Sequence, residues 1–113
     1  MKKKVSQRTA PKRKNEFRYH NVAVQKDNGK IKSQSHPSYI WQERGNMYDY
    51  HSITHSEHVN GVVLKKLRCN PNPNDSRDSY YDINSKADLK SRFGKKRKKW
   101  KMHPLDREEI HNK

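Results

Sequence analysis

The stretch SYIWQERGNMYDYHSI (38–53) contains the clearest structural signal in the chain. It begins with aromatic and β-branched residues, which are enriched in strands. ERGN (43–46) then supplies the glycine and asparagine typical of a tight turn. MYDYHSI (47–53) alternates, with two tyrosines and a serine on one face and the other four residues on the opposite face. The pattern predicts a β-hairpin, but neither face of its second strand is purely apolar, so the buried face stays open.

Further strands are expected on both sides of this hairpin. Before it, the apolar residues over 17–24 predict a strand that leads to the tight-turn signal DNG (27–29). After it, GVVLKKL (61–67) and SYYDI (79–83) predict two more strands. Between these two lies NPNPND (70–75), whose prolines and asparagines predict an ordered turn or an extended loop.

Near the C-terminus the pattern changes from strand to helix. Ser85 followed by Asp88 resembles a capping box, and Leu89 and Phe93 lie four residues apart on one helical face, so we expect a helix that ends at the next glycine. HPLDREEIH (103–111) predicts a second short helix, with a proline in its first turn and acidic residues early.

These elements predict a mainly β (α+β) fold. About five short antiparallel strands followed by one or two helices favour a small SH3-like barrel over a sandwich. Only 28% of the 113 residues are hydrophobic and 35% are charged, and segments with little to bury do not offset their ordering entropy. Residues 1–16 hold three apolar side chains, whereas 37–83 hold most of the large ones. We therefore expect a disordered basic tail over 1–16 and a single domain over 17–113.

The charge of the chain indicates a polyanionic partner. Lysine and arginine number 27 against 12 acidic residues, which gives a net charge of +15, and nucleic acid is the commonest partner of such a protein. No apolar run is long enough to span a bilayer, and no long amphipathic helix suits a membrane surface. The single cysteine, Cys69, excludes an internal disulfide framework and fits a reducing compartment. The expected location is the cytoplasm.

Two basic clusters are candidate phosphate-binding segments. The first lies in the tail and includes Lys12, Arg13 and Lys14. The second is KSRFGKKRKKWK (90–101), whose candidate residues are Lys95, Lys96, Arg97, Lys98, Lys99 and Trp100. Cations bind phosphates and aromatic rings stack on unpaired bases, so the second cluster suits single-stranded nucleic acid. The alternative is a solvated loop whose tryptophan packs on the core.

The segment HSITHSEH (51–58) contains three histidines. On a helix, His51, His55 and His58 share a face and could ligate zinc. The segment is β-rich, however, and on a strand His58 leaves the face that the other two share. It also lacks a cysteine pair or the glutamate of an HExxH helix. No metal is therefore predicted, and two alternatives stay open: exposed histidines at a strand end, or acid–base groups.

A second histidine lies in SHPS (35–38), where the following proline favours an extended backbone. SHPS and THS (54–56) each place a histidine beside hydroxyl groups, and in a hairpin or barrel both reach one rim. Carboxylates are scattered without a DxD or ExxxD cluster, which disfavours two-metal nuclease chemistry. The chain has no GxxxxGK[ST] or GxGxxG loop for nucleotides. No cofactor is expected.

From about residue 21 to 110 the chain resembles the PemK/MazF-like toxins, which are small β-barrel endoribonucleases of toxin–antitoxin systems. Three segments correspond in order to strands of that family: SHPSYIW (35–41), SITHS (52–56) and SYYDINSKADL (79–89). WKMHPLDREEI (100–110) is similar to the closing helix of the family. The chain departs from the family pattern in having a histidine where an arginine usually precedes the proline, and an inserted histidine within THS.

The resemblance implies metal-independent cleavage of single-stranded RNA. A base deprotonates the 2′-hydroxyl, which attacks the adjacent phosphorus, and an acid protonates the departing 5′-oxygen to leave a cyclic phosphate. Carried onto this chain, His36 and His55 form the acid–base pair, with the two roles unassigned. Thr54 contacts the scissile phosphate, Ser56 belongs to the same hydroxyl–imidazole group, and Lys32 supplies positive charge. An acidic antitoxin is then an expected partner, and a homodimer is an oligomeric state to consider.

Two other functions remain open. One is a non-catalytic nucleic-acid-binding protein that acts through residues 1–14 and 90–101. The other is an interaction protein whose charge serves an acidic protein partner. The paired HPS and THS motifs favour the enzyme, because a module that only binds phosphate does not need two histidines.

Overall fold

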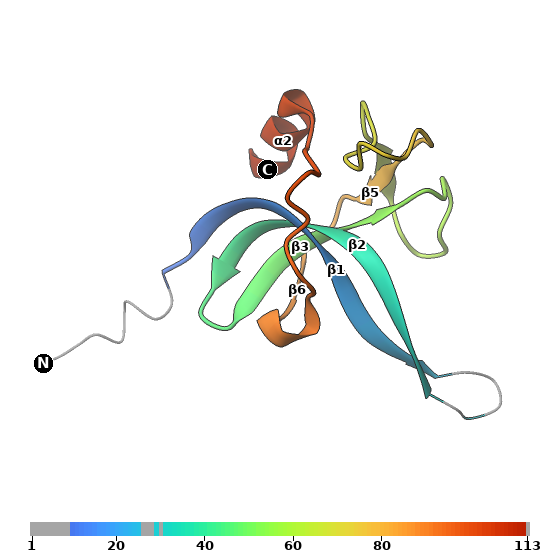
Figure 1. Ribbon diagram of the computed structural model, residues 1–113, viewed down its shortest axis with the longest axis vertical. Helices are drawn as coiled ribbons and strands as arrows, with labels where there is room; N and C mark the ends of the chain where they lie inside the picture. Colours follow the sequence, from blue (N-terminus) through green and yellow to red (C-terminus); the bar gives the residue numbers. More distant parts are fainter. Residues whose placement is uncertain (1–9, 26–28, 30, 113) are drawn as a thin grey trace, which may run out of the picture.

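The hairpin predicted over residues 38–53 lies at the centre of the structure. The computed structural model describes residues 10–25, 29 and 31–112, and over these ranges the chain forms a mainly antiparallel six-stranded sheet with one short α-helix near the C-terminus (Figure 1). Its elements are β1 (Lys12–Gln25), β2 (Ile31–Arg44), β3 (Met47–Thr54), β4 (Leu64–Lys66), β5 (Tyr80–Asp82), β6 (Lys86–Leu89), the 3-10 turn η1 (Lys90–Arg92) and α2 (Pro104–His111).

The two longest strands, β1 and β2, pair antiparallel, and β2 pairs antiparallel with β3. The turn between β2 and β3 contains Gly45 at a φ of +54°. This left-handed backbone carries no steric penalty for glycine, so the residue that signals the turn in the sequence also permits it. Of the predicted turn at 27–29, Gly29 has a φ of +83°, and residues 27 and 28 lie outside the described ranges.

Strand β3 has neighbours along both of its edges. One edge pairs with β2, and the other pairs first with β6 and then, near its C-terminal end, with β5. Strand β4 pairs with β5, which gives the order β1-β2-β3-β5-β4 with β6 beside β3. No pairing among the described strands joins the outer strands β1 and β4. The sheet is therefore open, and the expected SH3-like barrel is not confirmed.

Both faces of the β2–β3 hairpin are buried, which explains why the sequence of β3 has no purely apolar face. Consecutive strand residues point to opposite faces, so Tyr39 and Ile40 enter different cores. The first core joins the sheet to the C-terminal segment and consists of Phe17, Tyr39, Ile53, Leu67, Tyr81, Met102 and Ile110. The second core consists of Ile40, Tyr48, Tyr50 and Phe93, and Phe93 directly follows η1.

The helix expected over residues 85–93 is wrong. The structure has β6 and η1 there, because the free edge of β3 accepts a strand through pairs such as Tyr50↔Lys86. The helical spacing of Leu89 and Phe93 is misleading, since Leu89 is exposed and Phe93 is buried in the second core. Asp88 does not close a capping box and instead contacts the ring of His20, with 2.8 Å between Oδ2 and Nε2.

Several strand boundaries also differ from the prediction, and β2 begins at Ile31 rather than at Ser38, so that His36 lies within the strand. Strand β1 begins at Lys12, so residues 12–16 belong to the sheet rather than to a disordered tail, while residues 1–9 lie outside the described ranges. The end of β2 pairs with this early start, as Lys12 lies opposite Glu43 and Arg13 opposite Gln42. The buried carboxylate of Glu16 is held by Lys14 and Arg18 at 3.3 and 2.6 Å. Within GVVLKKL (61–67), only Leu64–Lys66 is strand.

The closing helix is confirmed as α2, with Pro104 at its start. The preceding His103 caps the helix, because the backbone N–H of Leu105 donates to its Nδ1 at 3.1 Å. This bond satisfies one of the amide groups that a helix start leaves unpaired. Across residues 10–25, 29 and 31–112, no helix combines the length and apolar character needed to cross a membrane.

Candidate active site

The HPS and THS motifs meet at one hollow of about 240 Å³. Ser38 pairs with Ser52 across β2 and β3, so the two antiparallel strands place the residue two before Ser38 and the residue two after Ser52 at the same end of the sheet. The hollow is lined by Tyr19, His36, Pro37, Ile53, Thr54, His55, Asn72, Asp75, Arg77 and Trp100. Strand pairing therefore brings His36, Thr54 and His55 to one cavity, although they are far apart in the sequence.

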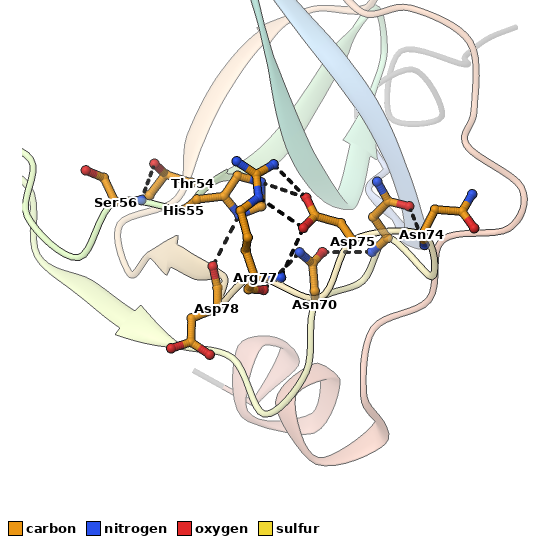
Figure 2. Close-up of polar contacts among 9 residues, drawn as sticks. Thr54, His55, Ser56, Asn70, Asn74, Asp75, Arg77 and Asp78 are labelled. Carbon is orange, nitrogen blue, oxygen red and sulfur yellow. Dashed lines mark hydrogen bonds and ion pairs between the residues drawn. The ribbon is translucent and has the colours of Figure 1, made fainter.

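The imidazole of His55 is held between two oxygen atoms of the loop over residues 75–78 (Figure 2). Its Nδ1 lies 3.2 Å from the backbone carbonyl oxygen of Asp78, and its Nε2 lies 3.3 Å from Oδ2 of Asp75. Both oxygens are hydrogen-bond acceptors, so only a ring protonated on both nitrogens donates to both of them.

The carboxylate of Asp75 is fixed by Arg77. The side chain of Arg77 donates from Nε to Oδ1 at 3.0 Å and from Nη2 to Oδ2 at 2.7 Å, and its backbone N–H donates to Oδ1 at 3.0 Å. These bonds hold the pKa of Asp75 well below its usual range, with the Arg77 side chain as the largest cause. Asp75 is therefore ionised near neutral pH and serves to position His55 rather than to accept a proton.

The NPNPND segment is confirmed as an ordered turn, and its own side chains hold it together. The Oδ1 atoms of Asn70 and Asn72 accept from the backbone N–H two residues later, at 2.9 and 3.0 Å. Nδ2 of Asn70 also donates to the carbonyl oxygen of Arg77 at 3.1 Å, which closes the loop (Figure 2). Asparagine side chains bond their own backbone readily in this way. The loop thus carries Asp75 and Arg77 to the hollow.

The other predicted site residues make fewer side-chain contacts than His55 does. His36 is exposed, and its Nε2 lies 3.3 Å from Oε1 of Gln34. Oγ1 of Thr54 accepts from the backbone N–H of Ser56 at 3.2 Å, which orders the chain just after β3. Ser56 is exposed and does not belong to the lining of the hollow. Lys32 lies in β2, but its side chain is outside the described part of the structure.

His36 also borders a second hollow of about 300 Å³, which contains His20 and Val22 from β1. His20 is buried, and its ring stacks on Phe93 with 4.6 Å between centroids. Together with its contact to Asp88, this packing holds His20 against the second core.

His51 and His58, the other histidines of HSITHSEH, do not line the hollow that contains His55. His51 is buried beside the ring of Tyr81, and its Nδ1 lies 2.8 Å from the carbonyl oxygen of Asp82. His58 is exposed. Within the part of the chain that the structure describes, no group of three or more histidine, cysteine or acidic side chains is placed to hold a metal ion.

The second basic cluster, residues 90–101, has exposed cations and a tryptophan that packs on the core. Residues 95–99 are exposed, whereas Trp100 is half-buried against Phe17 and Tyr19, with 5.8 Å between ring centroids in each pair. The guanidinium of Arg97 lies over the rings of Tyr19 and Trp100, at 5.3 and 5.8 Å from their centroids. The tryptophan therefore packs on the core while the cations stay accessible.

The candidates of the first basic cluster lie at the start of β1. Lys12 and Arg13 are exposed, and Lys14 is paired with Glu16 and Glu43, at 3.3 Å from each. Lys14 is therefore a weaker phosphate-binding candidate than its neighbours, since two carboxylates already share its charge.

Sequence reasoning missed Asp75, Arg77 and Tyr19 as site residues. A signal for the first two was present, since an aspartate and an arginine two residues apart directly follow the NPNP turn. Nothing in the local pattern connects them with a histidine some 20 residues earlier, because only the fold of the loop brings them together. Comparisons of the chain with protein-family models, with curated proteins and with solved structures find no match.

Proposed function

We propose that the protein is a metal-independent endoribonuclease that cleaves single-stranded RNA at the hollow between His36 and His55. The observation that carries the proposal is that both histidines, Thr54 and Arg77 line this one cavity. Two imidazoles can supply the acid and the base for transfer of a phosphoryl group to the 2′-oxygen, and a hydroxyl and a guanidinium can stabilise the charge that develops. The RNA 2′-hydroxyl, which is absent from DNA, is the nucleophile.

In this proposal His55 is the general acid and His36 is the general base. His55 enters the step protonated on both nitrogens, and its Nε2–H leaves the contact with Asp75 to give its proton to the departing 5′-oxygen. Nδ1–H stays on the carbonyl oxygen of Asp78, and Asp75 stays ionised. The contact between His36 and Gln34 is satisfied by Nε2–H, which leaves Nδ1 of a neutral ring to take the 2′-hydroxyl proton. The 2′-oxygen then bonds to phosphorus as the bond to the 5′-oxygen breaks, and water returns both histidines to their starting forms.

Arg77 and Thr54 are placed to stabilise the phosphate during the reaction. The guanidinium of Arg77 is exposed at the hollow, and although its Nε and Nη2 bond Asp75, its Nη1 takes no part in these bonds and is the atom that donates to a non-bridging oxygen in this proposal. Since the oxygen of Thr54 already accepts from the backbone, its hydroxyl hydrogen is available to donate to the same phosphate. Tyr19 and Trp100 form the aromatic part of the lining, which suits stacking with an unpaired base.

The resemblance to PemK/MazF-like toxins supports the same chemistry. We therefore include in the proposal that the protein is the cytoplasmic toxin of a toxin–antitoxin system, with an acidic antitoxin as its partner. The small SH3-like barrel and the homodimer belong to this part of the proposal. Coexpression with an acidic protein from a neighbouring gene tests whether the two form a toxin–antitoxin pair. An antitoxin should protect cells from the toxin and copurify with it.

The most direct test of the enzyme is incubation of the purified protein with an end-labelled single-stranded RNA in EDTA. We expect cleavage with 2′,3′-cyclic phosphate and 5′-hydroxyl ends, and no cleavage of the same sequence as DNA. RNA that stays intact over the whole range from pH 5 to 9 contradicts the proposal. If EDTA abolishes cleavage, the mechanism is metal-dependent and the proposed metal-independent mechanism is wrong.

The second candidate function is non-catalytic nucleic-acid binding. The exposure of Lys95, Lys96, Lys98 and Lys99 on one segment favours it, because exposed cations supply most of the affinity of non-specific binding. The same RNA assay separates the two functions. A binding protein shifts the labelled RNA in a gel without shortening it, and binds DNA of the same length comparably.

A further inference from the structure

A larger hollow lies beside the candidate active site, on the segment that leads to α2. It has a volume of about 610 Å³ and is lined by the basic residues Lys96, Arg97, Lys98, Lys101 and Arg107, together with Asn15, Glu16, Cys69, Trp100 and Met102 to Pro104. A neighbouring hollow of about 570 Å³ shares Asn15, Pro104 and Arg107 with it. This neighbouring hollow adds Arg13 and Lys14 from β1, and Glu108, His111 and Asn112 from the C-terminal segment, so that the carboxylate of Glu108 in α2 lies among its basic side chains. We call these two adjacent hollows the basic groove.

Apart from Lys14, which is paired with Glu16 and Glu43, the cations of the basic groove have no ion pair among the described residues. No side chain of Arg13, Lys96, Lys98, Lys101 or Arg107 makes an ion pair with a carboxylate of the described residues. Elsewhere basic side chains are paired, as Lys65 is with Glu109 and Arg44 is with Asp49. Glu16 borders the groove, but its carboxylate is already engaged by Lys14 and Arg18.

The segment that carries the lysines is held against β1 and the loop of the active site. Backbone N–H groups of Gly94 and Arg97 donate to the carbonyl oxygens of Tyr19 and Phe17, both at 2.8 Å. Further along, the N–H of Lys101 donates to the carbonyl oxygen of Pro71 at 3.1 Å. Figure 1 shows this orange-red segment crossing the strands on its way to α2. In the segment that these hydrogen bonds hold, Lys96 and Lys98 line the groove, whereas Lys95 and Lys99 do not.

Trp100 connects the basic groove to the candidate active site, because it lines both hollows. We propose that the basic groove binds the sugar–phosphate backbone of single-stranded RNA on one side of the scissile bond, with Trp100 at the junction. The inference rests on the proposed function, in that the bound strand is the one that the active site cleaves. Unpaired cations in a groove beside an aromatic junction are the arrangement that binds single strands without reading their sequence.

Binding of a 2′-O-methyl RNA, which lacks the nucleophile, tests this inference without cleavage. Fluorescence anisotropy over a series of salt concentrations compares Lys96→Ala/Lys98→Ala with the matched control Lys95→Ala/Lys99→Ala. Both variants lose two charges from the same exposed segment. We expect the groove variant to lower the slope of log K against log salt by about 1.4, since each phosphate contact to a single strand contributes about 0.7. The control should retain most of the slope.

Each outcome decides for or against the groove. Equal losses in the two variants show that only the number of charges matters, and no loss in either shows that RNA lies elsewhere; both overturn the inference. Tighter binding of a polyglutamate peptide than of RNA through Lys96 and Lys98 also overturns it, in favour of an acidic protein. Failure of the proposed function is separate, because it appears as absent cleavage of ordinary RNA while the groove variant still weakens binding of the analogue.

Discussion

The imidazole Nε2 of His55 lies 3.3 Å from Oδ2 of Asp75, and this carboxylate is in turn held by three hydrogen bonds from Arg77. The relationship places an ionised aspartate beside a histidine at the end of β3. It gives His55 an orientation that a histidine at a bare strand end lacks, and it makes the acid of the proposed reaction testable.

Asp75→Asn should lower RNA cleavage on the order of tenfold to a hundredfold while leaving RNA affinity nearly unchanged. The amide keeps the shape of the side chain but removes the negative charge that stabilises the protonated ring. Single-turnover cleavage measures the loss, and anisotropy measures affinity. The control is Asp78→Asn, because Asp78 contacts His55 through its backbone carbonyl, which the substitution retains. Equal effects of the two substitutions contradict the role of Asp75.

His36→Ala and His55→Ala should each reduce cleavage by about 10²–10⁴-fold, the range in which acid–base groups contribute. His58→Ala is the matched control, since His58 is an exposed histidine of the same segment that lies outside the hollow. RNA affinity should remain similar in all three variants. If His58→Ala is as damaging as His55→Ala, the assignment of His55 as the acid is wrong.

Stability should fall between pH 7.5 and pH 5.5 because of His111. Burial lowers the pKa of His111 below its ordinary value of 6.5, and the nearby guanidinium groups of Arg13 and Arg107 lower it further. Near pH 6 the unfolded chain therefore binds more protons at this residue than the folded chain does. The stability contributed by neutral His111 is complete above pH 6.5 and is lost as the pH falls through the lowered pKa of the folded state.

The hydrogen bonds of His111 agree with a neutral ring. The hydroxyl of Tyr39 donates to Oδ1 of Asn15 at 3.0 Å, so Nε2–H of His111 donates to the Tyr39 oxygen at 2.7 Å. Nδ1 is then an unprotonated atom, buried without a hydrogen-bond partner in the described structure. Urea denaturation of His111→Gln should show a smaller loss of stability between the two pH values than the parent protein. An unchanged loss assigns the pH dependence to other groups.

Leu67→Ala should destabilise the protein by about 2–5 kcal/mol, the usual cost of removing a buried leucine side chain. Leu67 is only 2% exposed and lies in the first core. Val63→Ala is the control, because Val63 is 59% exposed and its truncation should change stability by no more than about 0.5 kcal/mol. Denaturant unfolding followed by tryptophan fluorescence measures both, and equal effects would place Leu67 outside the core.

Local sequence signals were enough to predict several elements. The β2–β3 hairpin follows from strand alternation around Gly45, whose positive φ the turn requires. Helix α2 follows from Pro104 and the acidic residue in its first turn. The order within the 70–75 turn follows from asparagines that bond their own backbone. In each of these elements the deciding interactions join residues a few positions apart, so the sequence by itself determines them.

Tertiary structure decided the rest. Residues 86–89 have a helical pattern but form β6, because β3 offers an unpaired edge that no local pattern records. His51 and His55 look alike in the sequence, yet one is buried in the core and the other faces Asp75. The meeting of His36 with His55 and Arg77 depends on the register of β2 with β3 and on the position of a distant loop. Chain periodicity specifies which side a residue faces, whereas only packing between distant segments specifies what it meets there.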